Sequence, residues 1–232
     1  MATKKLVIRI LDLKVNSNGD FPGTKPSHDD DLGLKNNSLM ASLTYPRSGA
    51  SQVLSVKQYD LANGTPAVLI DPDHPDPFFD SLLFREDVDD QTVLNVKVTN
   101  LDESGKAGKF FLALFGAVFG AGVGAVTGGL SSVIGAIVGF GVDQIRSNVG
   151  SAGDAHVDVI GEARLPIQVA DFGAAPAIKQ LDLIAPATIQ RSGFVMSPVP
   201  GQGAVEQTID VTTKGRSNGT LTLEITATEA TP

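Results

Sequence analysis

The chain of 232 residues contains no cysteine and only three histidines. Without cysteine it can form neither a disulfide nor a zinc–thiolate site, and it has no thiol nucleophile. His28, His74 and His156 lie far apart in the sequence, so a histidine-rich metal centre is not expected. The motifs of serine hydrolases, phosphate-binding loops and zinc proteases are also missing. The sequence therefore predicts a protein that is not an enzyme.

Basic residues are scarce, with 18 Lys and Arg against 26 Asp and Glu, a formal net charge of −8. Nucleic-acid binding selects clustered Lys and Arg, and no such cluster occurs, so no nucleic-acid partner is expected. The amino end has a basic start but lacks the long apolar run of a signal peptide, because Arg9 and Asp12 interrupt it. We therefore expect synthesis in the cytosol without a signal peptide.

A third absence is local, since residues 110–142 contain no charged side chain. Glycines recur within this segment at every fourth position, and the spacing repeats after a break: Gly116, Gly120, Gly124, Gly128, Gly135 and Gly139. On a helix, residues four apart share one face, so these glycines would form a smooth groove for a second helix. With a turn at residues 127–129, the pattern predicts an apolar α-helical hairpin closed by a glycine zipper.

The glycines and the large apolar side chains of this segment are the residues that we expect to contact lipid or other copies of the chain. They are Phe110, Phe111, Leu114, Phe115, Gly116, Phe119, Gly120, Gly124, Gly128, Ile134, Gly135, Gly139 and Phe140.

Outside this segment the sequence predicts short β-strands, and the 13 prolines scattered there argue against helices. Leu94, Val96 and Val98 alternate with polar residues, a period of two that is typical of an antiparallel sheet with one solvated face. We expect an eight-stranded antiparallel β-sandwich. Its strands are predicted at residues 5–10, 39–44, 53–58, 67–70, 92–99, 157–169, 207–212 and 219–228.

Residues 158–167, DVIGEARLPI, resemble the D-x-I-G-x-x-x-[IL]-P-[IL] signature of C2 domains, the calcium- and phospholipid-binding β-sandwiches. Residues 96–102 are similar to the strand and loop that precede this signature in the family. Residues 6–10, followed by Asp20, resemble its opening strand and first loop, and residues 219–225 resemble its last strand. The likeness spans residues 5–228 apart from the apolar insertion.

The resemblance implies a division into three parts. Residues 1–104 and 154–232 would form the two parts of a C2-like sandwich, and residues 105–153 the inserted hydrophobic hairpin. The hairpin would then occupy the third top loop, one of the loops that dip into the membrane in C2 domains.

A calcium site is also implied by the resemblance. The positions of the family's ligands map onto Asp20, Asn37, Asn100, Asp102 and Asp158. Calcium prefers six to eight oxygen ligands, many of them carboxylates, and two of these five residues are neutral amides. The sequence therefore leaves open whether calcium is a cofactor.

Both ends of the apolar segment join strands of one domain, so both must emerge on the same side of a bilayer. Two helical legs of about 17 residues would each reach ~25 Å, slightly less than the ~30 Å of hydrocarbon. We expect a membrane-associated module that binds membrane lipids and forms homo-oligomers through its glycine zipper. It would act as an anchor or scaffold, or as a pore-forming effector. The alternative is a soluble structural subunit whose hairpins pack into a helical core shared by several copies.

Overall fold

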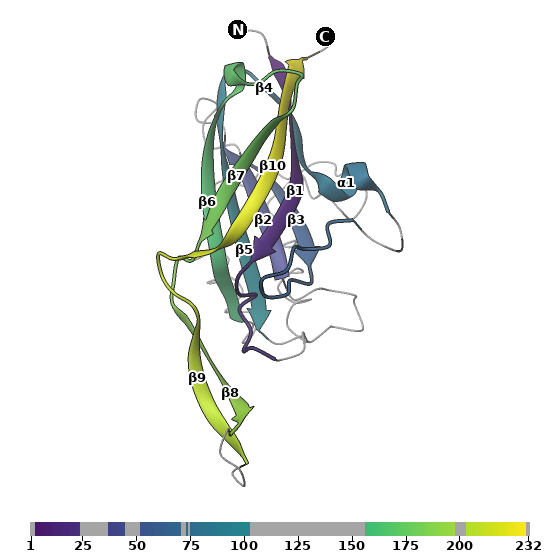
Figure 1. Cartoon of the computed structure of the whole chain (residues 1–232). Coiled ribbons are helices and arrows are strands. Elements are labelled where there is room, and N and C mark those ends of the chain that lie inside the picture. Colours follow the sequence, from purple (N-terminus) through teal and green to yellow (C-terminus); the bar gives the residue numbers. More distant parts are fainter. Residues whose placement is uncertain are drawn as a thin grey trace, which may run out of the picture.

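The computed structural model describes residues 3–23, 37–44, 52–70, 73, 75–102, 156–197 and 203–230, and this part of the chain is almost entirely β (Figure 1). It contains ten strands and two short helical elements. These are β1 (Lys4–Val15), β2 (Asn37–Thr44), β3 (Gln52–Tyr59), α1 (Pro77–Ser81), β4 (Leu82–Val88), β5 (Gln91–Asp102), β6 (His156–Gln168), η1 (Val169–Asp171), β7 (Ala177–Ile184), β8 (Ile189–Met196), β9 (Ala204–Thr212) and β10 (Ser217–Glu229).

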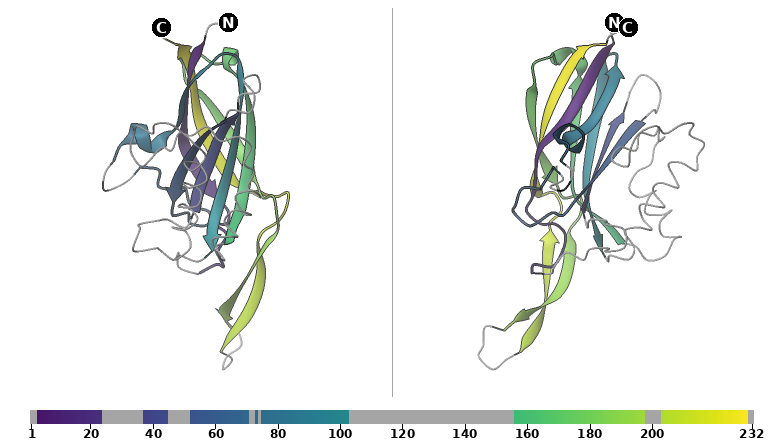
Figure 2. Two further views of the ribbon diagram at one scale, coloured as in Figure 1. Left: turned by 180° about the vertical axis from the view of Figure 1, so that it is seen from behind. Right: turned by 90° about the vertical axis from the view of Figure 1, so that its right-hand side faces the viewer.

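Eight of the strands form one antiparallel sheet in the order β3-β2-β5-β6-β7-β10-β1-β4. The sheet curls until its two edge strands, β3 and β4, approach each other, so that it is nearly closed (Figure 2). β6 leads through η1 into β7, and the two strands pair at Glu162 and Ile184, at the end of β7 away from η1. The remaining strands, β8 and β9, form a separate two-stranded hairpin.

The predicted fold class is therefore wrong. The expected sandwich of two sheets is a single sheet, because β6 and β7 are hydrogen-bonded neighbours. The part of the chain that the structure describes holds no helical hairpin, and its helix is limited to α1 and η1. Residues 105–153, to which that hairpin was assigned, lie outside the described part of the chain. Residues 67–70, predicted as a strand, form none.

The alternation of apolar and polar residues is confirmed where the sequence showed it best. Leu94, Val96 and Val98 of β5 are at most 1% exposed, and Leu221 and Leu223 of β10 are fully buried. All eight strands of the large sheet contribute side chains to one hydrophobic cluster in its interior. Burial of this apolar surface is the main stabilising contribution to the fold.

The gap between β3 and β4 is lined by charged side chains that face inward. Lys57 of β3 pairs in register with the core residue Leu39, and Glu86 of β4 pairs with the core residue Leu6, so both point toward the interior. Burial lowers the pKa of Lys57, against the opposing effect of Asp80, and burial raises the pKa of Glu86. Inward charges at sheet edges oppose edge-to-edge pairing, which explains why the sheet stays open here.

The buried hydroxyl of Tyr59 in β3 makes the stability of the protein depend on pH. This hydroxyl is buried and has no hydrogen-bond partner among the described residues. Burial, and then the negative charge of Asp80, raise the pKa of this hydroxyl above its usual 10.0. Its contribution to stability is therefore complete below pH 10 and is lost as the pH rises further, because only the unfolded chain ionises readily.

We expect Tyr59→Phe to be at least as stable as the parent at pH 7, since no hydrogen bond is lost. At about pH 11 it should lose less stability than the parent, because it has no hydroxyl to ionise on unfolding. Urea midpoints at the two pH values measure both effects. An equal alkaline loss in the two proteins would show that Tyr59 does not control it.

Candidate functional site

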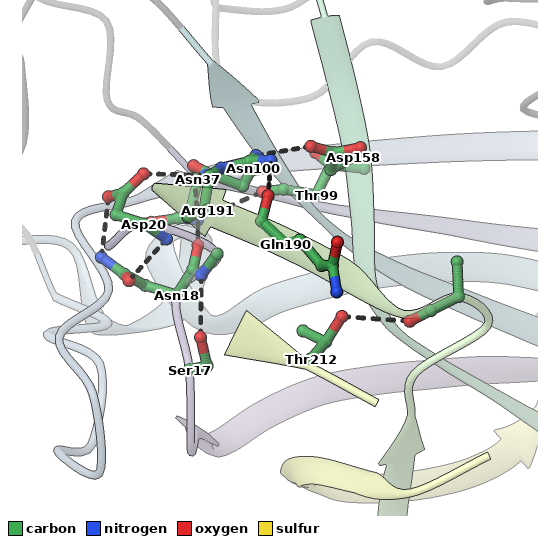
Figure 3. Close-up of polar contacts among 12 residues, drawn as sticks. Ser17, Asn18, Asp20, Asn37, Thr99, Asn100, Asp158, Gln190, Arg191 and Thr212 are labelled. Atoms are coloured by element: carbon green, nitrogen blue, oxygen red, sulfur yellow. Dashed lines mark hydrogen bonds and ion pairs between the residues drawn. The ribbon is translucent and has the colours of Figure 1, made fainter. Parts of the chain in front are cut away.

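Polar residues gather at the end of the sheet that lies opposite the chain termini (Figures 1 and 3). Asn37, the first residue of β2, pairs with Asn100 of β5, and Asn100 pairs in turn with Asp158 of β6. The loop after β1 brings Asn18 and Asp20 to the same place. We call these five residues the loop-end cluster.

The loop-end cluster brings together four of the five positions that the C2 resemblance implied for calcium. These four are Asp20, Asn37, Asn100 and Asp158. The backbone of the fifth, Asp102, lies two residues beyond Asn100 at the end of β5. The structure does not describe the side chain of Asp102.

Amide groups supply most of the hydrogen bonds within the cluster. Asn100 Nδ2 donates to Asp20 Oδ1 at 2.9 Å, and Asn18 Nδ2 donates to Asp20 Oδ2 at 3.0 Å. Asn37 Nδ2 donates to the backbone oxygen of Asn18 at 3.0 Å. Since Asn37 and Asn100 are at most 1% exposed, these bonds satisfy side chains that are cut off from water. Both carboxylate oxygens of Asp20 already accept hydrogen bonds.

A cation from the protein itself contacts the other carboxylate. Arg191 of β8 donates from Nη2 to Asp158 Oδ2, and the two side chains are only 18% and 15% exposed (Figure 3). Sequence reasoning missed Arg191, because it lies 33 residues from Asp158 in a strand that was not predicted. No motif around Arg191 indicates this partner.

The described side chains do not fit a calcium ion as they are arranged. Calcium needs six to eight oxygens, whereas here amide N–H groups point at Asp20 and a guanidinium occupies Asp158. Within the described ranges no group of three or more His, Asp and Glu side chains could hold a metal ion. What the arrangement does is join the loop after β1, the strands β2, β5 and β6, and the β8–β9 hairpin into one polar support.

A shallow groove of about 530 Å³ lies elsewhere, over the outer face of β5, β6 and β7. Its lining carries charges of both signs, among them Lys97, Glu162, Arg164 and Asp182. Lys97 Nζ and Glu162 Oε2 lie 3.9 Å apart and neutralise each other in part. The lining of this groove therefore carries no net charge.

Comparison with known proteins gives no family. No protein-family model matches the chain, and no curated protein is similar to it at a significant level. The likeness to C2 domains therefore stays a prediction that rests on the residues quoted above. No helix in the described part of the chain has the length and apolarity to span a membrane. The predicted lipid-contacting residues, from Phe110 to Phe140, lie outside that part.

Proposed function

We propose that the chain is a non-enzymatic β-sheet domain that associates with membranes through its charge-free segment, residues 110–142. In this proposal the folded sheet stays in water, and the segment provides both the lipid contact and the surface through which copies of the chain assemble.

One observation carries the proposal. Asp102, the last residue of β5, pairs with His156, the first residue of β6. The chain between them therefore leaves the sheet and returns to it at a single point. That point lies at the end of the domain away from both termini (Figure 1). A segment attached in this way can enter an apolar phase from one side without any strand of the sheet being displaced.

The composition of the segment supports lipid as that phase. Its 33 residues carry no charge, whereas the rest of the chain contains all the charged residues. The interior of the sheet is already filled by side chains from its own eight strands. Large exposed apolar surfaces on soluble domains are typical of membrane or protein contacts. We favour the membrane because nothing in the segment could satisfy a polar partner except backbone and three hydroxyls.

The test is flotation of the full chain with phosphatidylcholine vesicles. We expect the parent to float, and we expect a variant in which residues 110–142 are replaced by a short Gly-Ser linker to remain at the bottom of the gradient. Because Asp102 and His156 are already paired, the shortened connection still joins two neighbouring strand ends, and the variant should keep a cooperative β-sheet unfolding transition. Circular dichroism and thermal melting check this.

A matched pair of charge substitutions separates lipid contact from a general loss of solubility. Ile134→Arg places a cation in the segment, where insertion into hydrocarbon would cost about 2.5–3.5 kcal/mol and should strongly reduce flotation. Ile178→Arg makes the same change at an exposed position of β7 and should have no effect. A parent that never floats but elutes as a defined oligomer without detergent would favour the soluble assembly instead.

A further inference from the structure

The β8–β9 hairpin extends away from the sheet beyond the loop-end cluster (Figures 1 and 2). Its strands pair from Ile189 and Thr212 at the base to Met196 and Ala204 near the tip. A two-stranded hairpin by itself is marginally stable in water, so contacts with the rest of the domain are needed to stabilise it. The feature is absent from the sequence-based expectation, which placed only one short strand at residues 207–212.

That support is found on the side of the hairpin near the sheet. Arg191 contacts Asp158 at the start of β6. Gly193 lies so close to Phe21 that a Cβ at this position would be only 2.5 Å from Phe21 Cδ1. A larger residue at 193 would therefore force the Phe21 ring to move, so Gly193 allows the hairpin to pack closely against the loop that follows β1. These contacts orient the hairpin relative to the place where the chain leaves β5 and enters β6.

Beyond these contacts the hairpin is exposed and apolar. Phe194 is 73% exposed and Met196 is 79% exposed, and Val195 and Val205, which pair with each other, are exposed as well. At about 3.3 Å per residue, Met196 lies roughly 16 Å further along the strand than Arg191. Side chains of this size on an isolated projection have no role in the core of the domain. They mark a surface that meets another apolar surface.

Charge indicates what kind of surface this is. Between Arg191 and Asp210 the chain carries a single charge, Glu206, and no basic residue. Attraction to anionic lipid or to an acidic protein is therefore not available to the tip, which leaves burial of apolar side chains as its driving force. The tip also lies at the same end of the domain as the pair Asp102 and His156, where residues 103–155 leave the sheet (Figures 1 and 2).

We propose that the tip of the β8–β9 hairpin, through Phe194, Val195, Met196 and Val205, inserts into the interfacial layer of a zwitterionic bilayer as a second membrane contact beside the segment 110–142. This inference rests on the function proposed above. The contacts at the base of the hairpin then set the distance between the membrane surface and the loop-end cluster, and two separate membrane contacts fix the orientation of the domain on the bilayer.

The chain has no tryptophan, so one introduced indole reports on a single site. Phe194→Trp changes a residue that is mostly exposed and should fold like the parent. On addition of phosphatidylcholine vesicles we expect its emission to shift to the blue and to be quenched by brominated lipid. Ile178→Trp, at the end of β7 away from β8, is the matched control and should show neither change.

A second variant measures the effect on binding. Phe194→Ser combined with Met196→Ser should lower the partition coefficient of the full chain for these vesicles by about tenfold or more, because two large apolar contacts are lost. If the full chain binds vesicles while the indole at 194 is unchanged and the double variant binds normally, this inference fails and the proposed function stands. If no variant binds vesicles at all, the proposed function fails. A blue shift that depends on protein concentration without lipid would assign the tip to a second copy of the chain and overturn the inference.

Discussion

Replacing Gly219 with alanine is expected to destabilise the protein by about 3–5 kcal/mol, a large part of the ~5–15 kcal/mol typical of a folded domain. Gly219 has a φ of +153°, and a Cβ at this position would lie 2.1 Å from the backbone oxygen of Lys14 and 2.8 Å from the Cα of Val15. Neither neighbour is a flexible side chain that could move aside. The unfavourable backbone conformation and the overpacking each cost about 1–3 kcal/mol.

The effect should spread to the loop-end cluster, because Gly219 lies next to Asn218. Asn218 Nδ2 donates to the backbone oxygens of Ser17 and Ile160, and its Oδ1 accepts from the backbone N–H of Ser17. A shift of β10 at this point would break the bonds that hold the loop after β1 to the start of β6. We therefore expect the loop to be cleaved more readily by proteases in the variant.

Urea unfolding followed by circular dichroism measures the loss of stability. Gly173→Ala is the matched control, since no atom lies within 4 Å of the position that a Cβ would take at Gly173. The urea midpoint of Gly173→Ala should stay close to that of the parent, whereas the urea midpoint of Gly219→Ala should fall. In thermal unfolding, the melting temperature of Gly219→Ala should fall by roughly 10 °C or more. Equal midpoints for the two variants would show that β1 and β10 can separate at this point without cost.

Replacing Arg191 with methionine is expected to cost about 2–4 kcal/mol. Methionine keeps most of the apolar stem of the side chain but removes the guanidinium from a carboxylate, that of Asp158, which is only 15% exposed. Breaking one side of a buried ion pair is strongly destabilising, because the remaining charge loses a compensating charge in a medium of low polarity. The residual exposure of both side chains places the expected loss below that of a fully buried pair.

A double-mutant cycle separates this interaction from other effects of the substitution. Asp158→Asn removes the charge that Arg191 neutralises, so the double variant should be more stable than the sum of the two single losses predicts. Strict additivity of the two losses would mean that the pair contributes little.

The melting temperature of the parent should be the same with calcium and with EDTA, since Arg191 already contacts Asp158. A calcium-dependent rise would contradict the assignment of the loop-end cluster as a calcium-independent support.

Sequence reasoning predicted the buried and exposed rows correctly where apolar and polar residues alternate. Leu94, Val96 and Val98 of β5 and Leu221, Leu223 and Ile225 of β10 alternate with polar residues, and the structure buries them. β7 was not predicted, although Leu183 lies in the core, because Ile178 and Ile184 are apolar on its exposed face and obscure the pattern. The strand predicted at residues 67–70 is wrong. Its apolar residues suggested a strand, but they are not part of any β-ladder.

The candidate site divides in the same way. Four polar positions at the loop ends were named from the resemblance, and the structure brings them together because each lies at or just beyond the end of a strand that pairs with its neighbour. Arg191 could not be named. Its contact with Asp158 depends on where the β8–β9 hairpin passes the end of the sheet. No pattern in the residues around Arg191 indicates that position.

Reading the residues alone is enough to predict that the protein is rich in β-strands, which residues of the clearest strands face the core, and that one long segment carries no charge. These are local properties, set by the alternation of side chains and by composition. The three-dimensional fold was needed to find that eight strands form one nearly closed sheet, that Arg191 contacts Asp158, and that an apolar hairpin projects from the end where the uncharged segment departs. Hydrogen bonds between strands far apart in the chain determine those features, and the backbone groups that form them are the same in every residue but proline.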